Sequence, residues 1–309
     1  MESKKYDIII IGGGPAGLTA GIYSSRAKMK TLIVDTGTIG GQMILTFEIA
    51  NYPGVESTTG FQLAKTMKNQ AKSFGCDILS NVRLTDVEFK GKTKSVIINN
   101  KDKYSGKAII WATGGRSRML NIPGEKKFKG RGISYCATCD GDFFQDKEII
   151  VVGGGNSALE EAVALTKYAS KVTIVHEFDH FQAFEHAVEE AKKNPKIDFI
   201  MESHLQEFKG NDSLEKVVIK NLKSGKITEK RIDGVFIFVG YEANNDFLKD
   251  KDIKLNDWHE VVVNGNYETN EEGVFAAGDA LAKRYRQITT AVADGTIAAL
   301  NAIEFINRN

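Results

Sequence analysis

The stretch YDIIIIGGGPAG, residues 6–17, decides the fold of this 309-residue chain. Its β-branched run, residues 6–11, predicts a parallel strand that is buried on both faces of a sheet. The spacing G-x-G-x-x-G follows at once and leads into a helix-forming stretch, residues 18–26. In this context Gly12 permits a tight turn, Gly14 lets a pyrophosphate approach the backbone and Gly17 lets helix and strand pack closely. The stretch therefore predicts a βαβ unit that binds a dinucleotide.

An acidic residue stands where such a unit holds a ribose. A second strand, residues 31–34, ends at Asp35, which is 18 residues beyond Gly17, and an acid at this distance can accept hydrogen bonds from ribose hydroxyls. The helix that follows the glycines would point its positive end at the phosphates. A glycine-rich turn without a ligand is the alternative, but strand, turn, helix and acid all agree with a bound dinucleotide.

A second copy of this pattern lies about 140 residues further on. A buried strand, residues 149–152, is followed by GGGNSA, residues 153–158, then by a helix, residues 159–168, and a strand, residues 171–175. Ala158 replaces the third glycine, which the motif tolerates. Two such units predict two domains, and the breaker-rich passage after Gly114 marks the first boundary. Whether the second unit holds a nucleotide stays open at this point.

The remaining elements follow from hydrophobic periodicity and turn residues. Residues 82–107 alternate as short strands with charged turns, which is typical of an antiparallel excursion from a doubly wound sheet. The other expected helices are residues 61–74, 181–193 and 287–306, and the other expected strands are residues 108–113, 197–201, 216–221, 226–231, 235–239, 261–263 and 273–277. The chain is expected to cross back to the first domain at residues 240–245.

Two of the three cysteines stand in the sequence Cys136-Ala137-Thr138-Cys139-Asp140. Two thiols at this spacing are a redox pair, half of a metal site or a coincidence, and no second pair of ligands lies at a spacing suited to zinc. No metal is therefore expected. Asp140 is placed either to cap a helix or to give a proton to a leaving thiolate. Cys76 stands alone near the end of a helix, where a small thiol serves packing.

Composition excludes some classes of partner. Lys plus Arg (41) nearly balances Asp plus Glu (40), giving a net charge of +1, so no broad positive field for nucleic acid or anionic lipid is expected. No apolar run approaches the ~20 residues of a membrane span, and residues 1–6 do not have the pattern of a signal peptide. We therefore expect a cytoplasmic protein, in which a structural disulfide is unusual.

Residues 176–180, HEFDH, match the H-E-x-x-H motif of zinc proteases. That metal site needs both histidines on one face of a helix, but this segment directly follows a strand, so we treat the match as chance. In a dinucleotide fold the loop meets the adenine ribose. Carboxylates there, Glu177 and Asp179, would repel the 2′-phosphate of NADP by about 1 kcal/mol per charge pair at ~4 Å in water. The segment therefore disfavours NADP.

The whole chain resembles the low-molecular-weight bacterial thioredoxin reductases. CATCDG at residues 136–141, between the two glycine motifs, is the most specific part of this resemblance. The ordered motifs that carry it also include GGGPAG (12–17), GGQ (40–42), NYPG (51–54), ATGG (112–115), GGGNSALEEA (153–162), and Gly278-Asp279, Arg286-Gln287 and Thr290-Ala291.

The resemblance implies an α/β fold of two Rossmann-like, three-layer ββα domains, the second inserted into the first. Residues 1–115 and 245–309 would form an FAD-binding domain, and residues 116–244 a domain similar to NAD(P)-binding domains that carries the cysteines. Cys136 and Cys139 would be the disulfide that takes electrons from FAD and passes them to thioredoxin, with Asp140 as the proton donor. Members of the family are homodimers that rotate the inserted domain between reducing the disulfide and presenting it.

The resemblance also assigns contacts with FAD. Asp35 would lie at the adenosine ribose, Gln42 and Asn51 on the flavin side, Asp279 at the ribitol, and the backbone of Arg286 and Gln287 at the pyrimidine edge. The full implied set is Gly12, Gly14, Pro15, Ala16, Gly17, Asp35, Gly41, Gln42, Asn51, Thr113, Gly114, Gly278, Asp279, Arg286, Gln287 and Ile288.

The chain departs from the family at the electron donor. Members that use NADPH carry three arginines where this chain has Glu177, Phe178 and Gln182, and Ala243 replaces a proline of the crossing. This resembles the branch in which reduced ferredoxin feeds the flavin, with NADH or NADPH as alternative donors and a non-catalytic flavin-binding module as an alternative of another class. A basic landing site for acidic ferredoxin has two candidates, Arg116, Arg118, Lys126, Lys127, Lys129 and Arg131, or Lys283, Arg284 and Arg286; solvated surface is the other interpretation of both.

Overall fold

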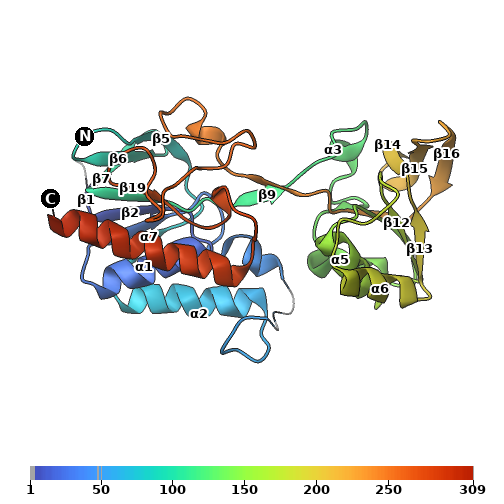
Figure 1. Ribbon diagram of the computed structural model, residues 1–309, viewed down its shortest axis with the longest axis horizontal. Helices are drawn as coiled ribbons and strands as arrows, with labels where there is room; N and C mark the ends of the chain where they lie inside the picture. The colour runs from blue at the N-terminus through green and yellow to red at the C-terminus, as the bar shows by residue number, and fades with distance from the viewer. Residues whose placement is uncertain (1–3, 47–48, 50, 309) are drawn as a thin grey trace. The chain divides into compact units, whose positions relative to one another are not determined.

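The computed structural model describes residues 4–46, 49 and 51–308, apart from the side chains of Leu45, Thr138 and Cys139. The chain divides into two compact units. Unit 1 comprises Met1–Arg116 and Glu242–Asn309, and unit 2 comprises Ser117–Tyr241. Each unit is built on its own sheet (Figure 1), and each is described separately below.

A five-stranded parallel sheet forms the centre of unit 1, and the YDIIII stretch lies in its middle strand. All four residues of that strand are buried, as expected for a β-branched run covered on both faces. Each fully buried isoleucine stabilises the fold by about 1.5–3 kcal/mol. In spatial order the strands are β19 (Val274–Ala276), β8 (Ala108–Trp111), β2 (Ile8–Ile11), β3 (Thr31–Val34) and β4 (Asp77–Leu79).

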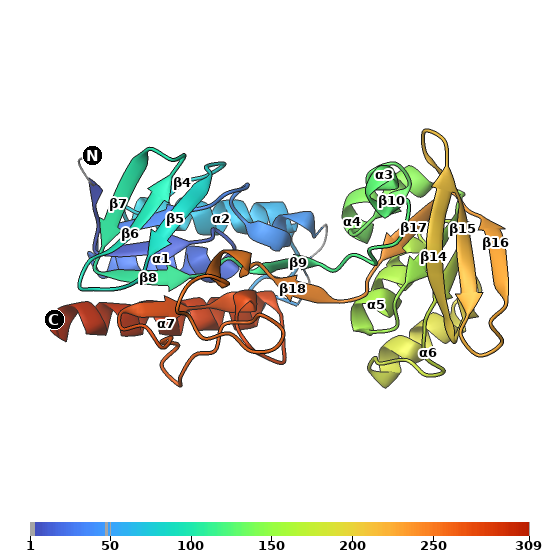
Figure 2. The ribbon, with the colours of Figure 1, turned by 90° about the horizontal axis from the view of Figure 1, so that it is seen from above.

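Unit 1 has three layers. Helices α1 (Pro15–Arg26), α2 (Gly60–Ser73) and α7 (Ile288–Arg308) cover one face of the parallel sheet, as Figures 1 and 2 show. The other face packs against a smaller sheet, which contributes Val87, Val96 and Tyr104 to the core. Its strands, in spatial order, are β1 (Lys4–Lys5), β7 (Asp102–Gly106), β6 (Lys94–Ile98) and β5 (Leu84–Glu88). The antiparallel pairing of β5, β6 and β7 confirms the predicted excursion.

Unit 2 repeats this plan. Helices α5 (Asn156–Leu165) and α6 (Glu185–Lys193) pack on one face of its parallel sheet, and an antiparallel sheet packs on the other. The parallel strands, in spatial order, are β10 (Ile133–Ser134), β17 (Gly234–Ile237), β11 (Glu148–Val152), β12 (Lys171–Val175) and β13 (Ile197–Ile200). The antiparallel strands are β14 (Ser203–Gly210), β15 (Leu214–Asn221) and β16 (Ile227–Arg231). The predicted α/β class with two Rossmann-like units is confirmed.

Short elements join these layers. Strands β9 (Gly115–Ser117) and β18 (Tyr241–Ala243), where the chain leaves and re-enters unit 1, pair with each other. The other short elements are η1 (Gly41–Leu45), α3 (Glu125–Phe128), α4 (Ala137–Asp140), η2 (Gly141–Phe144), η3 (Asp246–Leu248) and η4 (Gly278–Ala280). Within the described residues, no helix combines the length and apolar character needed to cross a bilayer.

Three expectations from the sequence were wrong in detail. The helix expected over residues 181–193 begins only at Glu185, because Gln182 donates its backbone N–H to the Gly154 carbonyl at 2.8 Å and is held in an extended conformation. The helix expected over 159–168 ends at Leu165. Residues 261–263 form no strand, since Val261 has only isolated bridges. Strand β14 was missed because bulges interrupt its alternation.

The contact between α1 and the glycine turn gives a first prediction. A Cβ atom at Gly17 would lie 1.8 Å from the Gly12 carbonyl oxygen. Gly17→Ala should therefore push α1 away from the sheet and lower the free energy of unfolding by about 1–3 kcal/mol or more. Urea denaturation measures the loss. The matched control is Gly265→Ala, whose Cβ would meet open space; an equal effect of the two substitutions contradicts the prediction.

Candidate active site

The first glycine turn is built by close backbone approach. Gly12 has φ of +111°, and a Cβ atom there would lie 2.1 Å from the Ala112 carbonyl oxygen. Only glycine fits this position. Helix α1 follows with Pro15 at its first turn, and Gly14 at its N-cap provides no side-chain hydrogen bond. The first amides of α1 are therefore available to an anion.

A second glycine leaves space in front of this helix. A Cβ atom at Gly14 would meet only the Gly41 Cα atom, at 3.9 Å, and one at Gly41 would lie 3.1 Å from the Gly14 Cα atom. Two backbones thus face each other with no side chain between them. This arrangement fits a pyrophosphate that is bound by backbone groups and the helix N-terminus.

Asp35 has a structural role besides its expected one. Its carboxylate accepts hydrogen bonds from the backbone N–H groups of Gly13, at 2.5 Å, and Gly37, at 2.7 Å. It therefore fastens the glycine turn to the end of β3. An ionised carboxylate has about four lone-pair sites, so two sites remain for the ribose hydroxyls that the sequence assigns to Asp35.

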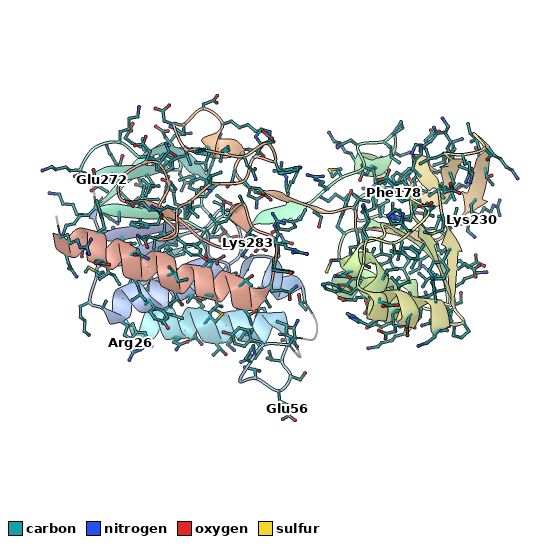
Figure 3. The ribbon with its side chains drawn as sticks, viewed as in Figure 1. Arg26, Glu56, Phe178, Lys230, Glu272 and Lys283 are labelled. Atoms are coloured by element: carbon teal, nitrogen blue, oxygen red, sulfur yellow. The ribbon has the colours of Figure 1, made fainter. Side chains whose placement is uncertain are left out.

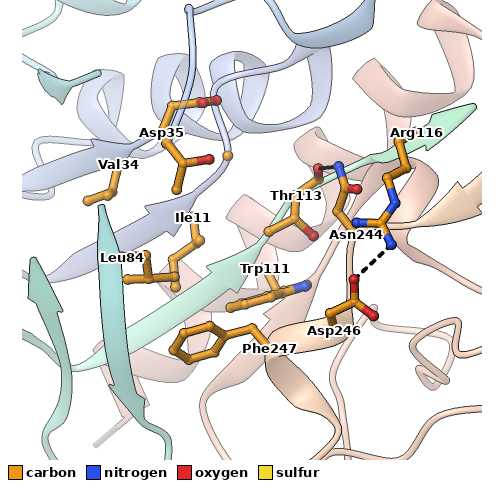
Figure 4. A pocket seen from close by; sticks show the side chains of 12 residues that line it. Ile11, Val34, Asp35, Leu84, Trp111, Thr113, Arg116, Asn244, Asp246 and Phe247 are labelled. Atoms are coloured by element: carbon orange, nitrogen blue, oxygen red, sulfur yellow. Dashed lines mark hydrogen bonds and ion pairs between the residues drawn. The ribbon is translucent and has the colours of Figure 1, made fainter. Parts of the chain in front are cut away.

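A cavity of about 410 Å³ opens beside Asp35 at the carboxyl ends of β2, β3 and β8. Trp111 and Phe247 lie at its base, with ring centroids 6.3 Å apart, and Thr113 lines it (Figure 4). Trp111 donates its Nε1–H to the Oδ1 atom of the fully buried Asn245 at 2.9 Å. The cavity therefore combines the aromatic surface of Trp111 and Phe247 with polar side chains, Asp35 among them, a combination that suits a nucleoside.

Asp279 belongs to a buried ionic network. The Lys283 Nζ atom lies 3.1 Å from Asp279 Oδ1 and 2.7 Å from Asp294 Oδ2. Tyr267 donates its hydroxyl to Asp294 at 2.9 Å. Burial, together with this bond, raises the pKa of Tyr267 to about 12. Burial also raises the pKa of Asp279, although Lys283 opposes the rise. A desolvated carboxylate held by one lysine is suited to accept hydrogen bonds from a polyol.

The residues assigned to the flavin come together near the start of α7. The Asn51 Nδ2 atom lies 3.5 Å from Gln287 Oε1. Arg286 pairs with Glu260, and its Nε atom is buried without a hydrogen-bond partner among the described residues. A buried donor that lacks a partner fits a site for a polar ligand. Gln42 is exposed, and Gly114 and Gly278 have positive φ.

The second glycine turn, unlike the first, is packed against a histidine ring. The His176 ring packs directly on Gly154, because a Cβ atom there would lie 2.3 Å from His176 Cε1. Its Nε2–H donates to the His180 carbonyl at 3.1 Å, and burial lowers the pKa of the His176 imidazole. The segment is not helical, and the described residues include no cluster of metal ligands. Glu177 and Phe178 are exposed on this loop, and Figure 3 labels Phe178.

The dithiol segment directly follows β10. Cys136 is disulfide-bonded, whereas the side chain of Cys139 lies outside the described part of the structure. The Ser134 hydroxyl donates to Asp140 Oδ2 at 2.5 Å and accepts the backbone N–H of Cys136 at 3.0 Å. Asp140 is thus held next to the cysteine backbone. Phe143, in η2, is 69% exposed.

Cys76 has the packing role expected from the sequence. Its residue is 5% exposed, it belongs to the core between the helices and the parallel sheet, and its thiol is free. Burial raises the pKa of the Cys76 thiol to about 11. A thiol that stays protonated is a poor nucleophile.

One candidate basic surface is contradicted by the structure. Lys283 and Arg286 are largely buried and paired with carboxylates, so they do not form a landing site with Arg284. In the other candidate, Arg116 is paired with Glu242 and Asp246. The exposed cations left in that candidate are Arg118, Lys126, Lys127, Lys129 and Arg131.

Comparisons with known proteins agree with this geometry. The family model described as "Pyridine nucleotide-disulphide oxidoreductase" matches residues 6–295. Thioredoxin reductase of Peptoclostridium acidaminophilum is 46% identical over 311 residues, covering 98% of each protein. Lactococcus lactis thioredoxin reductase matches with a TM-score of 0.93 at 43% identity, covering 98% of this chain and 100% of that one. A ferredoxin-flavin thioredoxin reductase from Clostridium acetobutylicum is more distant, at 29% identity and a TM-score of 0.54 over all of both chains.

The chain belongs to the thioredoxin reductase family of pyridine nucleotide-disulphide oxidoreductases. As a member of this family, the reductase binds FAD. The open space between Gly14 and Gly41, the acceptors on Asp35 and Asp279 and the buried Nε donor of Arg286 all fit that cofactor. When bound, FAD supplies two-electron redox chemistry.

Sequence reasoning missed several residues of the site. Asp294 and Lys283 support Asp279, Asn245 fixes Trp111, and Ser134 holds Asp140. One signal was present for Asp294, which stands among the small buried residues of α7 as its only charged buried position in the part described. Nothing in the sequence marked Ser134 or Asn245, because their roles depend on contacts made by the fold.

Asp279 is expected to lower the stability of the apoprotein and to strengthen the binding of FAD. Asp279→Asn removes a desolvated charge while Lys283 keeps Asp294 as its partner. We expect a higher Tm for the apoprotein at neutral pH and an FAD affinity weaker by about tenfold or more, since the ligand loses a charged acceptor. The gain in Tm should fade in acid, because the raised pKa of Asp279 means that protonation relieves the wild-type penalty as the pH falls through it.

Calorimetry of the apoprotein and titration with FAD measure these two effects. Asp257→Asn, at an exposed carboxylate, is the control and should change neither. A lower Tm in Asp279→Asn, or unchanged FAD affinity, contradicts the assignment.

Proposed function

We propose that this thioredoxin reductase uses a Cys136–Cys139 disulfide, which is reduced by electrons from the donor and is then oxidised again by thioredoxin. Two electrons and two protons convert the disulfide to two thiols. One thiolate then attacks the thioredoxin disulfide, whose S–S bond breaks and whose leaving sulfur takes up a proton. The second thiol displaces the mixed disulfide, so the Cys136–Cys139 bond forms again and thioredoxin leaves as a dithiol.

Asp140 is the proposed proton donor to a leaving thiolate. A general acid must be held within hydrogen-bond reach of the group that it serves. Asp140 directly follows Cys139, and the hydrogen bond from Ser134 fixes its carboxylate beside the cysteine backbone. Helix capping, the alternative role, has less support, because Asp140 is the N-cap of η2 without a side-chain cap bond.

The proposed docking point for thioredoxin includes Phe143. This ring is 69% exposed, three residues beyond Asp140 in the sequence. A large exposed aromatic side chain beside a reactive group is typical of a partner site, because aromatic residues dominate interface energetics.

The proposed electron donor is reduced ferredoxin rather than NADPH. The observation that carries this choice is the loop over the second glycine turn, where Gln182 bridges to Gly155. The loop presents Glu177, Phe178 and Gln182 and contains no lysine or arginine. A 2′-phosphate needs such cations. The exposed Lys126, Lys127, Lys129 and Arg131, together with Arg118, offer a basic surface to an acidic protein.

NADH is the second candidate donor. Glu177 directly follows β12 and His176, at the position where an acid binds the ribose hydroxyls of NAD. Helix α5 starts from Gly155 without a side-chain cap, so its amides would be available to a pyrophosphate. The named relatives at higher identity are thioredoxin reductases whose names state no donor.

A homodimer in the cytoplasm is the proposed working form. Helices α1 and α7 pack against each other and carry the exposed apolar side chains of Tyr23, Ile297 and Leu300. Apolar side chains on neighbouring helices are suited to a contact between copies of a chain. The cytoplasm keeps thiols reduced, which suits a dithiol that must be regenerated.

Anaerobic mixing separates the donors. Ferredoxin, NADH or NADPH is added to the oxidised enzyme and flavin bleaching is followed. We expect rapid bleaching with reduced ferredoxin and slow bleaching with NADPH; rapid bleaching with NADPH overturns the proposal, and rapid bleaching with NADH alone favours the second candidate. A triple variant, Glu177→Arg, Phe178→Arg and Gln182→Arg, should speed reduction by NADPH by about tenfold or more. The control Glu185→Arg, on α6, should not.

The cysteines separate an enzyme from a flavin-binding module. A Cys136→Ser and Cys139→Ser double variant should keep FAD but reduce thioredoxin only at the background rate, because it lacks the reversible dithiol. Cys76→Ala is the matched control and should retain activity, since that thiol is buried and stays protonated. Thioredoxin reduction by the double variant at the wild-type rate would make the module the better explanation.

A further inference from the structure

Ser134 occupies a rigid position directly before the dithiol segment. It is the last residue of β10, pairs in register with Phe236 of β17 and is 4% exposed. A strand of the central sheet therefore fixes its backbone, while its side chain points to the segment that follows. No solvent is needed to satisfy its hydroxyl, because the protein supplies both donor and acceptor.

The hydroxyl makes contacts with two residues of the redox segment. Its oxygen accepts the backbone N–H of Cys136 at 3.0 Å, and its proton is directed to Asp140 Oδ2 at 2.5 Å. The Cys136 carbonyl is the other acceptor within reach, but at 3.2 Å it is the longer contact. A hydroxyl has one proton to donate, and the shorter contact, to Asp140, lies within the usual range of an O–H···O hydrogen bond, whereas the contact to the Cys136 carbonyl is longer than that range.

We propose that Ser134 is a positioning residue of the dithiol site. It holds the Asp140 carboxyl group by one oxygen, and it holds the Cys136 backbone, so that in its protonated form the carboxyl group can give the proton on its other oxygen to a leaving thiolate. This inference rests on the proposed role of Asp140 as the proton donor. Ser134 does not touch the reacting sulfur in this scheme. It acts through Asp140, whose carboxylate would otherwise be free to rotate.

Position matters here because proton transfer is sensitive to distance. A general acid contributes about 10²–10⁴-fold when it is held in hydrogen-bond reach, and a displacement of about 1 Å can cost much of that factor. Loss of the Ser134 hydroxyl would remove the hydrogen bond that it accepts from the partly buried Cys136 N–H, and it would loosen the carboxyl group of Asp140. The expected loss is therefore smaller than that caused by removing the acid itself.

The test uses full-length holoenzyme that has been reduced with dithiothreitol and freed of excess reagent, so no natural donor is involved. Single-turnover reduction of a bacterial thioredoxin disulfide is followed from neutral to alkaline pH. We expect Ser134→Ala to slow the exchange by about tenfold and to change its pH profile. Asp140→Asn should cost more, and the double variant should cost no more than Asp140→Asn alone, because both changes act on one proton transfer.

Two further variants test whether the effect belongs to the Ser134 hydroxyl. Ser134→Thr retains the hydroxyl and should restore the pH profile of the wild type. Ser203→Ala removes another buried serine hydroxyl of unit 2, one that donates to the Met201 carbonyl at 2.9 Å; it should change stability without moving the profile. FAD content and Tm are measured for every variant, so a purely structural effect of Ser134→Ala would appear as lost stability with an unchanged profile.

The variants distinguish a failure of the Ser134 role from a failure of the Asp140 role on which it rests. If Asp140→Asn leaves the profile unchanged, the proton-donor role of Asp140 fails and the role of Ser134 fails with it. If Asp140→Asn moves the profile but Ser134→Ala does not, or if the two effects are fully additive, only the positioning role is overturned. A moved profile in Ser134→Ala, restored in Ser134→Thr and absent in Ser203→Ala, supports it.

Discussion

The structure of unit 1 depends on the contact between the backbones of Gly12, Gly17 and Ala112. There is no room for a Cβ atom at either glycine. This close approach seats α1 on the sheet, so that the helix begins directly behind the turn and leaves Gly14 open to an anion. Asp35 then ties the turn to the neighbouring strand. One steric constraint thus places the proposed phosphate site and the proposed ribose acceptor, Asp35, together.

A second feature of unit 1 is a group of buried charged side chains around Asp279. Asp279 sits in a site that disfavours its ionised form, and Lys283 and Asp294 surround it at an energetic cost. A structural core would use apolar residues in these places. A network of this kind is expected where a polar ligand must be recognised, because a functional site gives up stability for specific contacts.

The sequence predicted those features that local chemistry controls. The buried strand at residues 8–11 and its glycine turn followed from β-branched residues and spacing, and the packing role of Cys76 followed from its isolation. Whether a charged side chain is exposed or buried was harder to predict from its position in the sequence. Lys283 and Arg286 resemble a surface run, yet the fold largely buries Lys283 beside Asp279 and Asp294 and partly buries Arg286 beside Glu260. The start of α6 was misplaced for a similar reason, because Gln182 pairs with a turn that precedes it by almost thirty residues.

The proposed catalytic cycle requires that this chain hold FAD and a reversible dithiol that exchange electrons. This requirement is tested by an anaerobic reductive titration of the purified protein with dithionite, with thiols counted before and after. We expect a yellow protein that takes up about four electrons, two for the flavin and two for the disulfide, and gains two titratable thiols. A colourless protein, or a flavin that takes up about two electrons while the thiol count stays constant, would contradict it.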